Sequence, residues 1–549
     1  MSDNLIVRTP SAYSYPLIIK NMFLAPIVDN PDQEIVYRDS LRFSYREFKK
    51  RVRRLANALT AMGVKPGDTV AIMDWDSHRY LECFYAVPML GAILHTVNVR
   101  LSPEQIIYTI DHAEDDFLLV NSEFLPILDQ IKGRINTVKE FVILHDDENG
   151  PITELSIPIP IVGEYEALLA KASAQFEFAD LDENTRATTF YTTGTTGLPK
   201  GVYFSHRQLV LHTLSTIAAL GTSAKQGRFH QQDVYMPITP MFHVHAWGFP
   251  YIATTTGVKQ VYPGKYVPST LLNLMKTEKV TFSHCVPTIL SMLIASPEFE
   301  SIDLSNWKVL IGGAALPKKM CRIAKAKGID IFTGYGMSET CPILTLAHVG
   351  NEELSDDADT EIRCKTGRSL PLTQIRVVDE EMNDVPADGE SVGEIVVRSP
   401  WLTQGYLKDS RNSETLWKGG YLHTGDVATI NADNYINITD RMKDVIKVGG
   451  EWLSSLELED IINLHSRVVE VAVIGINDDK WGERPLALII LDSAGDAPKE
   501  KDIINHVRSF IDRGLMTKLA LLMKVEYVDI IDKTSVGKIN KKELRKKRQ

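Results

Sequence analysis

Short apolar segments alternate with amphipathic ones over the N-terminal part of the chain, and this alternation most narrows the choice of fold. The segment 44–64 begins with a capping-box pattern of Ser44 and Glu47, and Gly63 favours a helix end. It places six apolar side chains on one helical face: Tyr45, Phe48, Val52, Leu55, Leu59 and Met62. Continuous apolar runs typical of buried strands occur at 69–75, 117–121 and 141–146. Alternating strands and helices predict an α/β fold with a mainly parallel sheet.

The later part of the chain indicates further units. The length of 549 residues exceeds what one hydrophobic core supports, so we expect two or more domains. The acidic run at 351–361 is interpreted as a solvated loop. Strand-like runs separated by turn residues over 374–439 predict a small β-rich subdomain. A compact α+β unit is indicated near the C-terminus by two apolar runs and a helical pattern: 468–476, 485–491 and 501–514.

Composition excludes several classes of protein. The net charge of -11 argues against a nucleic-acid-binding surface over the whole chain. The five cysteines show no CxxC spacing, which suggests neither a zinc site nor a disulfide framework. The N-terminus lacks a signal-peptide pattern, and the most apolar stretch, 83–94, is too short to cross a bilayer. We therefore expect a cytoplasmic protein without integral membrane association.

The glycine- and threonine-rich stretch YTTGTTGLPKGV, residues 191–202, is a candidate phosphate-binding loop. It is not a Walker A sequence, because only two residues separate Gly194 and Gly197. Glycines still let backbone N–H groups approach a polyphosphate, threonine hydroxyls add donors, and Lys200 adds charge. A flexible linker is the alternative. The strand-like ATTFY before the loop and the helical segment 205–220 after it predict the strand, turn and helix of a phosphate site.

Three other segments carry groups suited to a nucleotide. IFTGYGMSETCP supplies Tyr335 for stacking on a base, Ser338 as a donor to phosphate and Glu339 as a magnesium ligand. In YLHTGDVATI, Asp426 can accept hydrogen bonds from a ribose diol, and Lys538 follows a glycine near the C-terminus. Each segment has an ordinary alternative: a surface turn, a capping aspartate or a solvated basic tail.

Taken in order, these segments resemble the adenylate-forming superfamily, and within it the acyl-CoA synthetases that activate fatty acids. The resemblance extends from about residue 15 to 547 and is carried by YTTGTTGLPKGV, PMFHVHAWGFP, VPT, IGGAALP, GYGMSET, GYLHTGD, DRMKDVIKVGGEW and KTSVGKI. It implies an α/β fold with a large N-terminal domain, residues 1–440, of doubly wound mixed sheets plus a small β-barrel-like subdomain. A hinge at 441–444 and a small mobile α+β C-terminal domain, 445–549, follow.

The resemblance also implies a two-step reaction. A carboxylate attacks the α-phosphate of ATP, which gives an acyl-adenylate and pyrophosphate, and coenzyme A then displaces AMP. Repelling anions meet in the first step, so catalysis should rest largely on positioning and positive charge. The implied co-substrates and cofactor are ATP, coenzyme A and Mg²⁺.

Residues that match the family motifs take the corresponding roles by resemblance. Lys200 and the loop before it contact the β- and γ-phosphates: Thr192, Thr193, Gly194, Thr195, Thr196 and Gly197. Glu339 matches the magnesium ligand, and Lys538 the catalytic lysine that bridges carboxylate and α-phosphate. Lys443 lies at the hinge between the two steps, and Gly450 matches a glycine that lets the thiol arm of coenzyme A pass. Further nucleotide contacts are Gly313, Ala314, Tyr335, Gly336, Ser338, Asp426 and Arg441.

The acid pocket is predicted from PMFHVHAWGFP and from the residues before VPT. His243 matches the residue beside the carboxylate, where amino-acid-activating relatives have an aspartate, and Trp247 resembles an indole that gates an acyl tunnel. His284 and Cys285 stand where smaller residues are common and would shorten the tunnel, so we expect a medium-chain or short fatty acid. A plain core aromatic is the alternative for Trp247. A metal site at His243 and His245 is disfavoured, since no third ligand follows nearby.

Two other functions stay open at this point. A luciferase-like oxygenase shares every ATP motif, and a related enzyme could transfer the acyl group to a separate carrier protein. The expected partners are a small carboxylic acid, ATP and coenzyme A, without nucleic acid. A homodimer is implied only by analogy with relatives. The basic C-terminal tail is interpreted as solvated, with membrane contact as the alternative.

Overall fold

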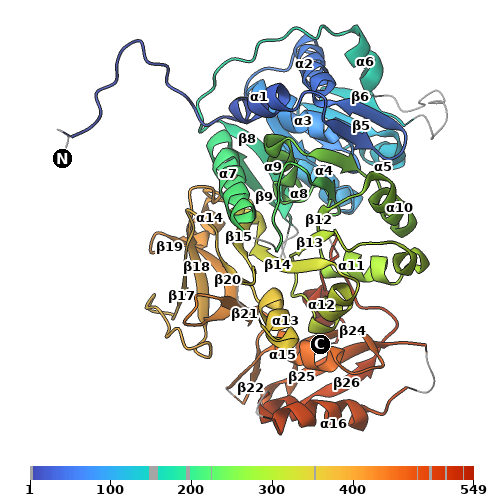
Figure 1. Ribbon diagram of the computed structural model, residues 1–549, viewed down its shortest axis with the longest axis vertical. Coiled ribbons are helices and arrows are strands. Elements are labelled where there is room, and N and C mark those ends of the chain that lie inside the picture. Colours follow the sequence, from blue (N-terminus) through green and yellow to red (C-terminus); the bar gives the residue numbers. More distant parts are fainter. Residues whose placement is uncertain are drawn as a thin grey trace.

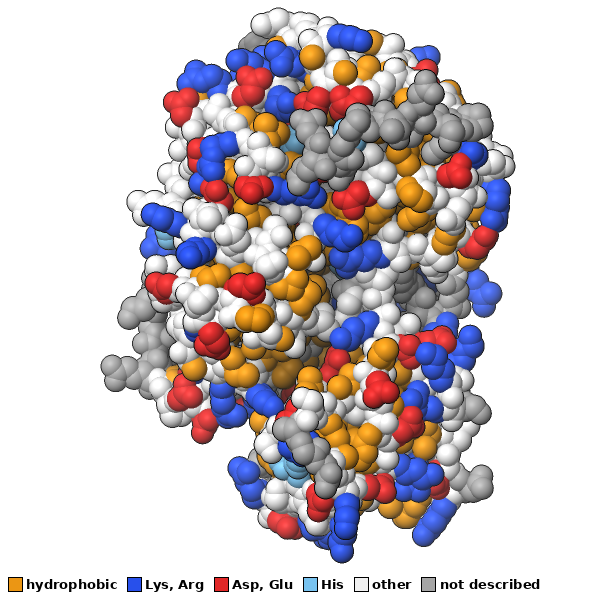
Figure 2. All heavy atoms as spheres, turned by 90° about the vertical axis from the view of Figure 1, so that its right-hand side faces the viewer, with side chains coloured by type: hydrophobic (Ala, Val, Ile, Leu, Met, Phe, Trp, Pro, Cys, Tyr) orange, Lys and Arg blue, Asp and Glu red, His pale blue; other side chains and the backbone are white. Residues whose placement is uncertain are grey.

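The computed structural model describes residues 4–146, 159–192, 198–223, 226–350, 354–449, 451–478, 480–493, 497–513, 516–535 and 537–548. Figure 1 shows a large N-terminal part at the top, a β-rich part at its lower left and a small C-terminal part at the bottom. In Figure 2 the C-terminal part forms a lobe below the large one, and positive and negative side chains are intermingled on this face. The predicted α/β class with its β-rich subdomain and α+β C-terminal unit is confirmed.

A seven-stranded sheet in the order β7-β6-β5-β3-β4-β8-β9 forms the first layer of the large part. Its strands are β3 (Thr69–Met73), β4 (Ile93–Thr96), β5 (Phe117–Asn121), β6 (Glu140–Leu144), β7 (Ile161–Glu164), β8 (Arg186–Thr192) and β9 (Lys200–Ser205). Every neighbouring pair is parallel except β8 and β9. The associated helices are α2 (Tyr45–Ala61), α3 (His78–Met89), α4 (Pro103–Ala113), α5 (Leu125–Ile131), α6 (Tyr165–Lys171) and the short η1 (Ser122–Phe124).

Periodicity predicted these elements well. In α2, five of the six side chains assigned to the apolar face are buried, and only Met62, beyond the last helical turn, is partly exposed. The Ser44 side chain accepts a hydrogen bond from the Glu47 backbone N–H at the N-terminus of the helix. The three strands predicted from continuous apolar runs are β3, β5 and β6.

A nine-stranded sheet in the order β16-β15-β14-β13-β12-β10-β11-β1-β2 forms the second layer. Its strands are β1 (Glu34–Tyr37), β2 (Leu41–Ser44), β10 (Val234–Pro237), β11 (Lys259–Tyr262), β12 (Phe282–Cys285), β13 (Lys308–Ile311), β14 (Asp330–Gly336), β15 (Ile343–Leu346) and β16 (Arg368–Ser369). The associated helices are α1 (Ile19–Asp29), α7 (His206–Thr222), α8 (Val244–Trp247), α9 (Phe249–Thr256), α10 (Pro268–Glu278), α11 (Pro287–Ile294), η3 (Pro297–Ser301), α12 (Lys318–Ala326) and η4 (Ser338–Thr340).

The β-rich part begins after a helix that the sequence did not predict. The acidic run was interpreted as a loop, but α13 (Asp356–Cys364) occupies most of it, so that interpretation is wrong for residues 356–361. Ser355 caps this helix by accepting from the Ala358 N–H, and three aspartates in the first turn interact favourably with the helix dipole. A five-stranded curled sheet follows: β17 (Gln374–Val378), β18 (Gly393–Arg398), β19 (Trp417–Lys418), β20 (Tyr421–Ile430) and β21 (Ile436–Arg441), with α14 (Ser410–Leu416) beside it.

The C-terminal part has its own sheet and its own apolar cores. Its strands are β22 (Ile446–Val448), β23 (Glu451–Leu453), β24 (Val468–Asp478), β25 (Gly482–Leu491) and β26 (Lys524–Tyr527). Its helices are α15 (Ser455–Asn463), α16 (Glu500–Ile511), η5 (Lys518–Leu522) and α17 (Lys541–Lys546). None of the helices in the described part of the chain is long and apolar enough to cross a membrane.

Candidate active site

The carboxyl ends of parallel strands bring most of the predicted site together. β10, β12, β13 and β14 run parallel in the nine-stranded sheet, so the segments that follow them leave from the same edge. These segments contain PMFHVHAWGFP, VPT, IGGAALP and GYGMSET. The first of them also meets the seven-stranded sheet, because the Thr96 hydroxyl donates to the Phe242 carbonyl oxygen at 3.1 Å.

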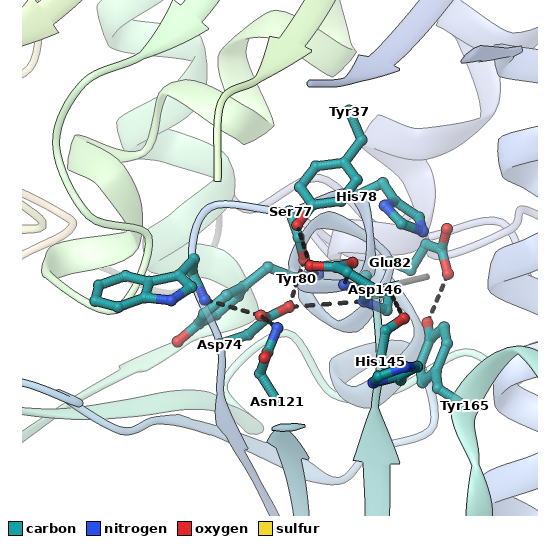
Figure 3. A network of polar contacts seen from close by, with 12 residues as sticks. Tyr37, Asp74, Ser77, His78, Tyr80, Glu82, Asn121, His145, Asp146 and Tyr165 are labelled. Atoms are coloured by element: carbon teal, nitrogen blue, oxygen red, sulfur yellow. Dashed lines mark hydrogen bonds and ion pairs between the residues drawn. The ribbon is translucent and has the colours of Figure 1, made fainter. Parts of the chain in front are cut away.

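A buried polar network lies at the carboxyl-end edge of the parallel strands in the seven-stranded sheet. Directly after β3, the carboxylate of Asp74 accepts hydrogen bonds from the Ser77 hydroxyl at 2.5 Å and from the Asn121 amide at 2.7 Å (Figure 3). Two residues on, Asp76 accepts from the Met241 N–H at 2.8 Å and from the Tyr266 hydroxyl. Burial raises the pKa of Asp76 to about 7 despite these donors. Asp76 therefore ties the edge of one sheet to the acid motif of the other.

The acid motif adopts an unusual backbone. Val244, His245, Ala246 and Trp247 all have positive φ, between 47° and 58°, so the short segment α8 is a left-handed turn. This conformation costs roughly 1–2 kcal/mol per non-glycine residue and persists only where the surroundings impose it. The two histidines of the motif have different surroundings. His243 lies near the Lys538 charge, whereas His245 is buried against Phe84 and Phe190.

Both histidines of this motif are neutral at neutral pH. Burial, with the charges of Lys538 and Arg100, lowers the pKa of His243 to about 3. Burial alone lowers that of His245 to about 3. Among the described residues no cluster of three His, Cys, Asp or Glu side chains could hold a metal ion.

Trp247 and His284 meet in the predicted acid pocket. Their ring centroids are 5.0 Å apart, and the indole lies against Gly312, where an added Cβ would be 3.0 Å from Cη2. His284 is fully buried, stacks on Phe249 and shares a 2.9 Å hydrogen bond with the Tyr235 hydroxyl. The structure places Cys285 in an apolar core instead, as expected for the next residue of the strand.

The predicted nucleotide residues form a connected cluster. The Tyr335 hydroxyl donates to Asp426 at 2.7 Å, and the Arg441 guanidinium lies 3.1 Å from the other oxygen of the same carboxylate. Asp426 and Arg441 are opposite each other on β20 and β21. Burial, and then the Asp426 charge, raises the pKa of Tyr335 well above its ordinary value. Ser338 is partly buried in η4, next to this cluster in sequence.

Two glycines and an alanine line the same edge. An added Cβ at Gly336 would lie 1.8 Å from the Pro342 carbonyl oxygen, so this position requires glycine. Gly313 has φ +77°, and a Cβ there would be 3.1 Å from Cε of Lys538. Gly313 and Ala314 are both exposed.

Glu339 has a partner that sequence reasoning missed. The residue is 7% exposed, and its carboxylate accepts a hydrogen bond from the Tyr406 hydroxyl at 2.7 Å. The Lys200 ammonium lies 4.5 Å from the centroid of the same tyrosine ring, a cation–π contact. In the sequence, the signal was only a tyrosine that directly follows a glycine, Gly405.

The phosphate-binding loop has a different context from the one predicted. β8 and β9 are antiparallel, with Thr192 opposite Lys200, so the loop joins two strands of a hairpin. The predicted order of strand, turn and helix is wrong, since α7 begins only after β9. α7 therefore does not begin at this loop, and Lys200 is the first residue of β9. The loop residues Thr193, Gly194, Thr195, Thr196 and Gly197 lie outside the described residues.

Lys538 reaches this site from the C-terminal part. Burial and the Arg441 charge lower its pKa from 10.5 to about 8, while the Asp426 and Glu339 carboxylates act in the opposite direction. An added Cβ at Gly313 would lie 3.1 Å from Cε and 3.7 Å from Nζ of Lys538, so the ammonium lies close to this predicted nucleotide residue. Lys443 is exposed in the turn after β21, and Gly450 lies outside the described residues.

The comparisons with known proteins identify the family of the chain. Residues 26–407 match the AMP-binding enzyme family, and residues 457–538 match the AMP-binding enzyme C-terminal domain. The chain therefore belongs to the AMP-binding enzyme family. It superposes on the anthranilate CoA ligase AuaEII in complex with anthranoyl-AMP with a TM-score of 0.84 at 23% identity, covering 97% of this chain and 98% of that one, which shows the shared fold.

Relatives of higher identity narrow the class. The chain is 38% identical to a long-chain-fatty-acid–CoA ligase of Thermus thermophilus, over 92% of this chain and 90% of the relative. It is also 38% identical to a 3-methylmercaptopropionyl-CoA ligase of Ruegeria lacuscaerulensis, over 92% and 91% of the two chains. The prediction of an AMP-forming acid–CoA ligase is confirmed at the level of this class.

Proposed function

We propose that the chain activates a short- or medium-chain carboxylic acid with ATP and transfers the acyl group to coenzyme A. The observation that carries this proposal is the position of Lys538. A lysine from the C-terminal part lies in one site with His243 of the acid motif, Glu339 and the Asp426–Arg441 pair. One cation between the acid motif and the nucleotide motifs suits a reaction that joins two anions.

In adenylate formation, the first step, we assign each of these side chains a separate role. Asp426, held by Arg441, would accept from the ribose hydroxyls, and the Tyr335 ring would stack on adenine. Neutral His243 adds no charge of its own, so the acid carboxylate would interact chiefly with the Lys538 ammonium. The same ammonium would neutralise charge on the α-phosphate as the new bond forms.

Mg²⁺ fits the described residues. Glu339 keeps one carboxylate oxygen free of the Tyr406 hydroxyl, and a magnesium site in such enzymes needs one or two carboxylates together with phosphates and waters. We therefore propose Glu339 as the protein ligand. The ion would supply charge neutralisation for the triphosphate.

The acid pocket favours a short acyl chain. Behind Trp247, the buried rings of His284, Tyr235 and Phe249 stack on one another, with centroids 4.7 to 5.9 Å apart. Each additional methylene gains about 0.8 kcal/mol only where it can be buried, and this stack fills space that a long chain would need. The relatives above are named for acyl groups of very different length, so their names leave the chain length open.

For the second step we propose that the C-terminal part rotates about residues 441–444. Cε of Lys538 lies 3.1 Å from the position of an added Cβ at Gly313, and we assign this arrangement to adenylate formation. Lys443 lies in a turn where the Asp444 and Val445 N–H groups both donate to the Arg441 carbonyl oxygen. A short turn of this kind can absorb the backbone rotation of a hinge. The domain limits, a cytoplasmic location and a homodimer stay predictions.

The test is release of AMP and pyrophosphate from ATP and Mg²⁺ with straight-chain acids of about two to sixteen carbons, with and without coenzyme A. We expect a coenzyme-A-dependent maximum at a short or medium length. Lys538→Ala should abolish adenylate formation and leave thioester formation from supplied acyl-adenylate largely intact. Adenylate that accumulates without any response to coenzyme A would contradict the proposed acceptor. It would favour a carrier protein, or an oxygenase if product formation required oxygen.

A further inference from the structure

The loop that carries Lys538 rests on the segment after β4, and this contact has no role in the reaction described so far. The Asn98 side-chain amide donates to the Ser535 hydroxyl at 3.0 Å, across 437 residues of sequence. The Arg100 guanidinium donates to the Ser535 carbonyl oxygen at 3.4 Å. We propose that Asn98 and Arg100 are positioning residues that hold Lys538 in the site during acid activation. This inference rests on the proposed function.

Asn98 is preorganised for this contact. It is 6% exposed, and its side-chain oxygen accepts from the Arg100 backbone N–H at 3.0 Å. That bond fixes the orientation of the amide, so the nitrogen faces Ser535 as a donor. Asn98 lies two residues beyond the end of β4, at the same sheet edge as Asp76, and the bond that orients its amide lies within its own segment.

Arg100 links the contact to the acid motif. Its guanidinium lies 5.9 Å from the Phe242 ring centroid and 6.0 Å from that of Tyr266. Tyr266 and the Met241 N–H both donate to Asp76. The residue that holds the lysine loop therefore also packs on the segment that presents His243.

Hydrogen bonds within the loop couple the position of Ser535 to that of Lys538. The Thr534 N–H donates to the Lys538 carbonyl oxygen at 2.7 Å, and the Lys538 N–H donates to the Thr534 hydroxyl at 3.2 Å. Gly537, with φ +83°, lies so close to Thr288 that an added Cβ would be 2.9 Å from its hydroxyl. Because these bonds close a tight turn, fixing Ser535 fixes the backbone from which the lysine side chain extends.

The test separates the two half-reactions in the full-length enzyme. Asn98→Ala and Ser535→Ala should each slow adenylate formation about five- to tenfold, and the double variant should be no slower than either single variant. Thioester formation from supplied acyl-adenylate should stay unchanged, because the proposed rotation removes Lys538 from the site. The loss should appear in kcat for the first step, with the KM for ATP little changed.

Matched controls lie on the surface away from the site. Ser509→Ala in α16 and Arg134→Ala should leave both half-reactions unchanged, whereas Arg100→Ala should slow only the first. Equal loss in both half-reactions, additive effects of the two single variants, or full retention of adenylate formation would each overturn the inference. A wild-type enzyme that forms no adenylate with any acid would instead reject the proposed function.

Discussion

Lys538 should set an upper pH limit for acid activation. In the free enzyme its pKa is lowered from 10.5 to about 8, chiefly by burial, which corresponds to roughly 3 kcal/mol of disfavoured charging. The lysine is charged below that pKa and neutral above it. Only the charged form attracts the carboxylate and the α-phosphate, so kcat/KM for adenylate formation should fall about tenfold per pH unit above about pH 8.

Bound ATP should move this limit. Its phosphates add negative charge beside the ammonium and favour the protonated form, so the fall in kcat should begin at higher pH than the fall in kcat/KM. Lys538→Arg should lower the rate but remove the limit, because a guanidinium stays charged throughout this range. This comparison tests whether the loss of activity at alkaline pH comes from deprotonation of Lys538 and not from unfolding.

Rapid-mixing measurements of pyrophosphate release between about pH 6 and 10 test this reasoning. Thioester formation from supplied acyl-adenylate is the internal control, since it should rise with pH as the coenzyme A thiol ionises. A wild-type profile that is flat through the alkaline range would refute the assignment. So would a limit that persists unchanged in Lys538→Arg.

Two further substitutions test the acid pocket and the backbone of the site. Trp247→Ala should change the preferred acyl chain length in competition assays and leave the KM for ATP almost unchanged; a change confined to ATP would remove Trp247 from the acid site. Gly336→Ala should lower the free energy of unfolding by more than about 3 kcal/mol, because the new methyl would lie 1.8 Å from a carbonyl oxygen. Gly221→Ala near the end of α7, where a Cβ meets nothing within 4 Å, is its control, and equal melting temperatures for the two variants would contradict the argument.

Sequence patterns predicted the elements that are defined by the residues of a single segment. The apolar face and cap of 44–64 define α2, and continuous apolar runs define β3, β5 and β6, because periodicity and burial act within one element. The acidic run before the β-rich part shows the limit of this reasoning. Its charge indicated a loop, yet the Ser355 cap and the dipole of α13 make the same aspartates favourable in a helix.

The ordered motifs identified the class of enzyme, since each motif carries its chemistry in a few adjacent side chains. Contacts between distant segments needed the tertiary structure. Tyr406 lies 67 residues from the Glu339 carboxylate it contacts, and Asn98 lies 437 residues from Ser535. Tertiary packing imposes the left-handed turn at 244–247, although non-glycine residues disfavour this backbone conformation. Sequence thus determined which groups are present, and the convergence of two sheet edges decided which of them meet, because spatial proximity depends on topology.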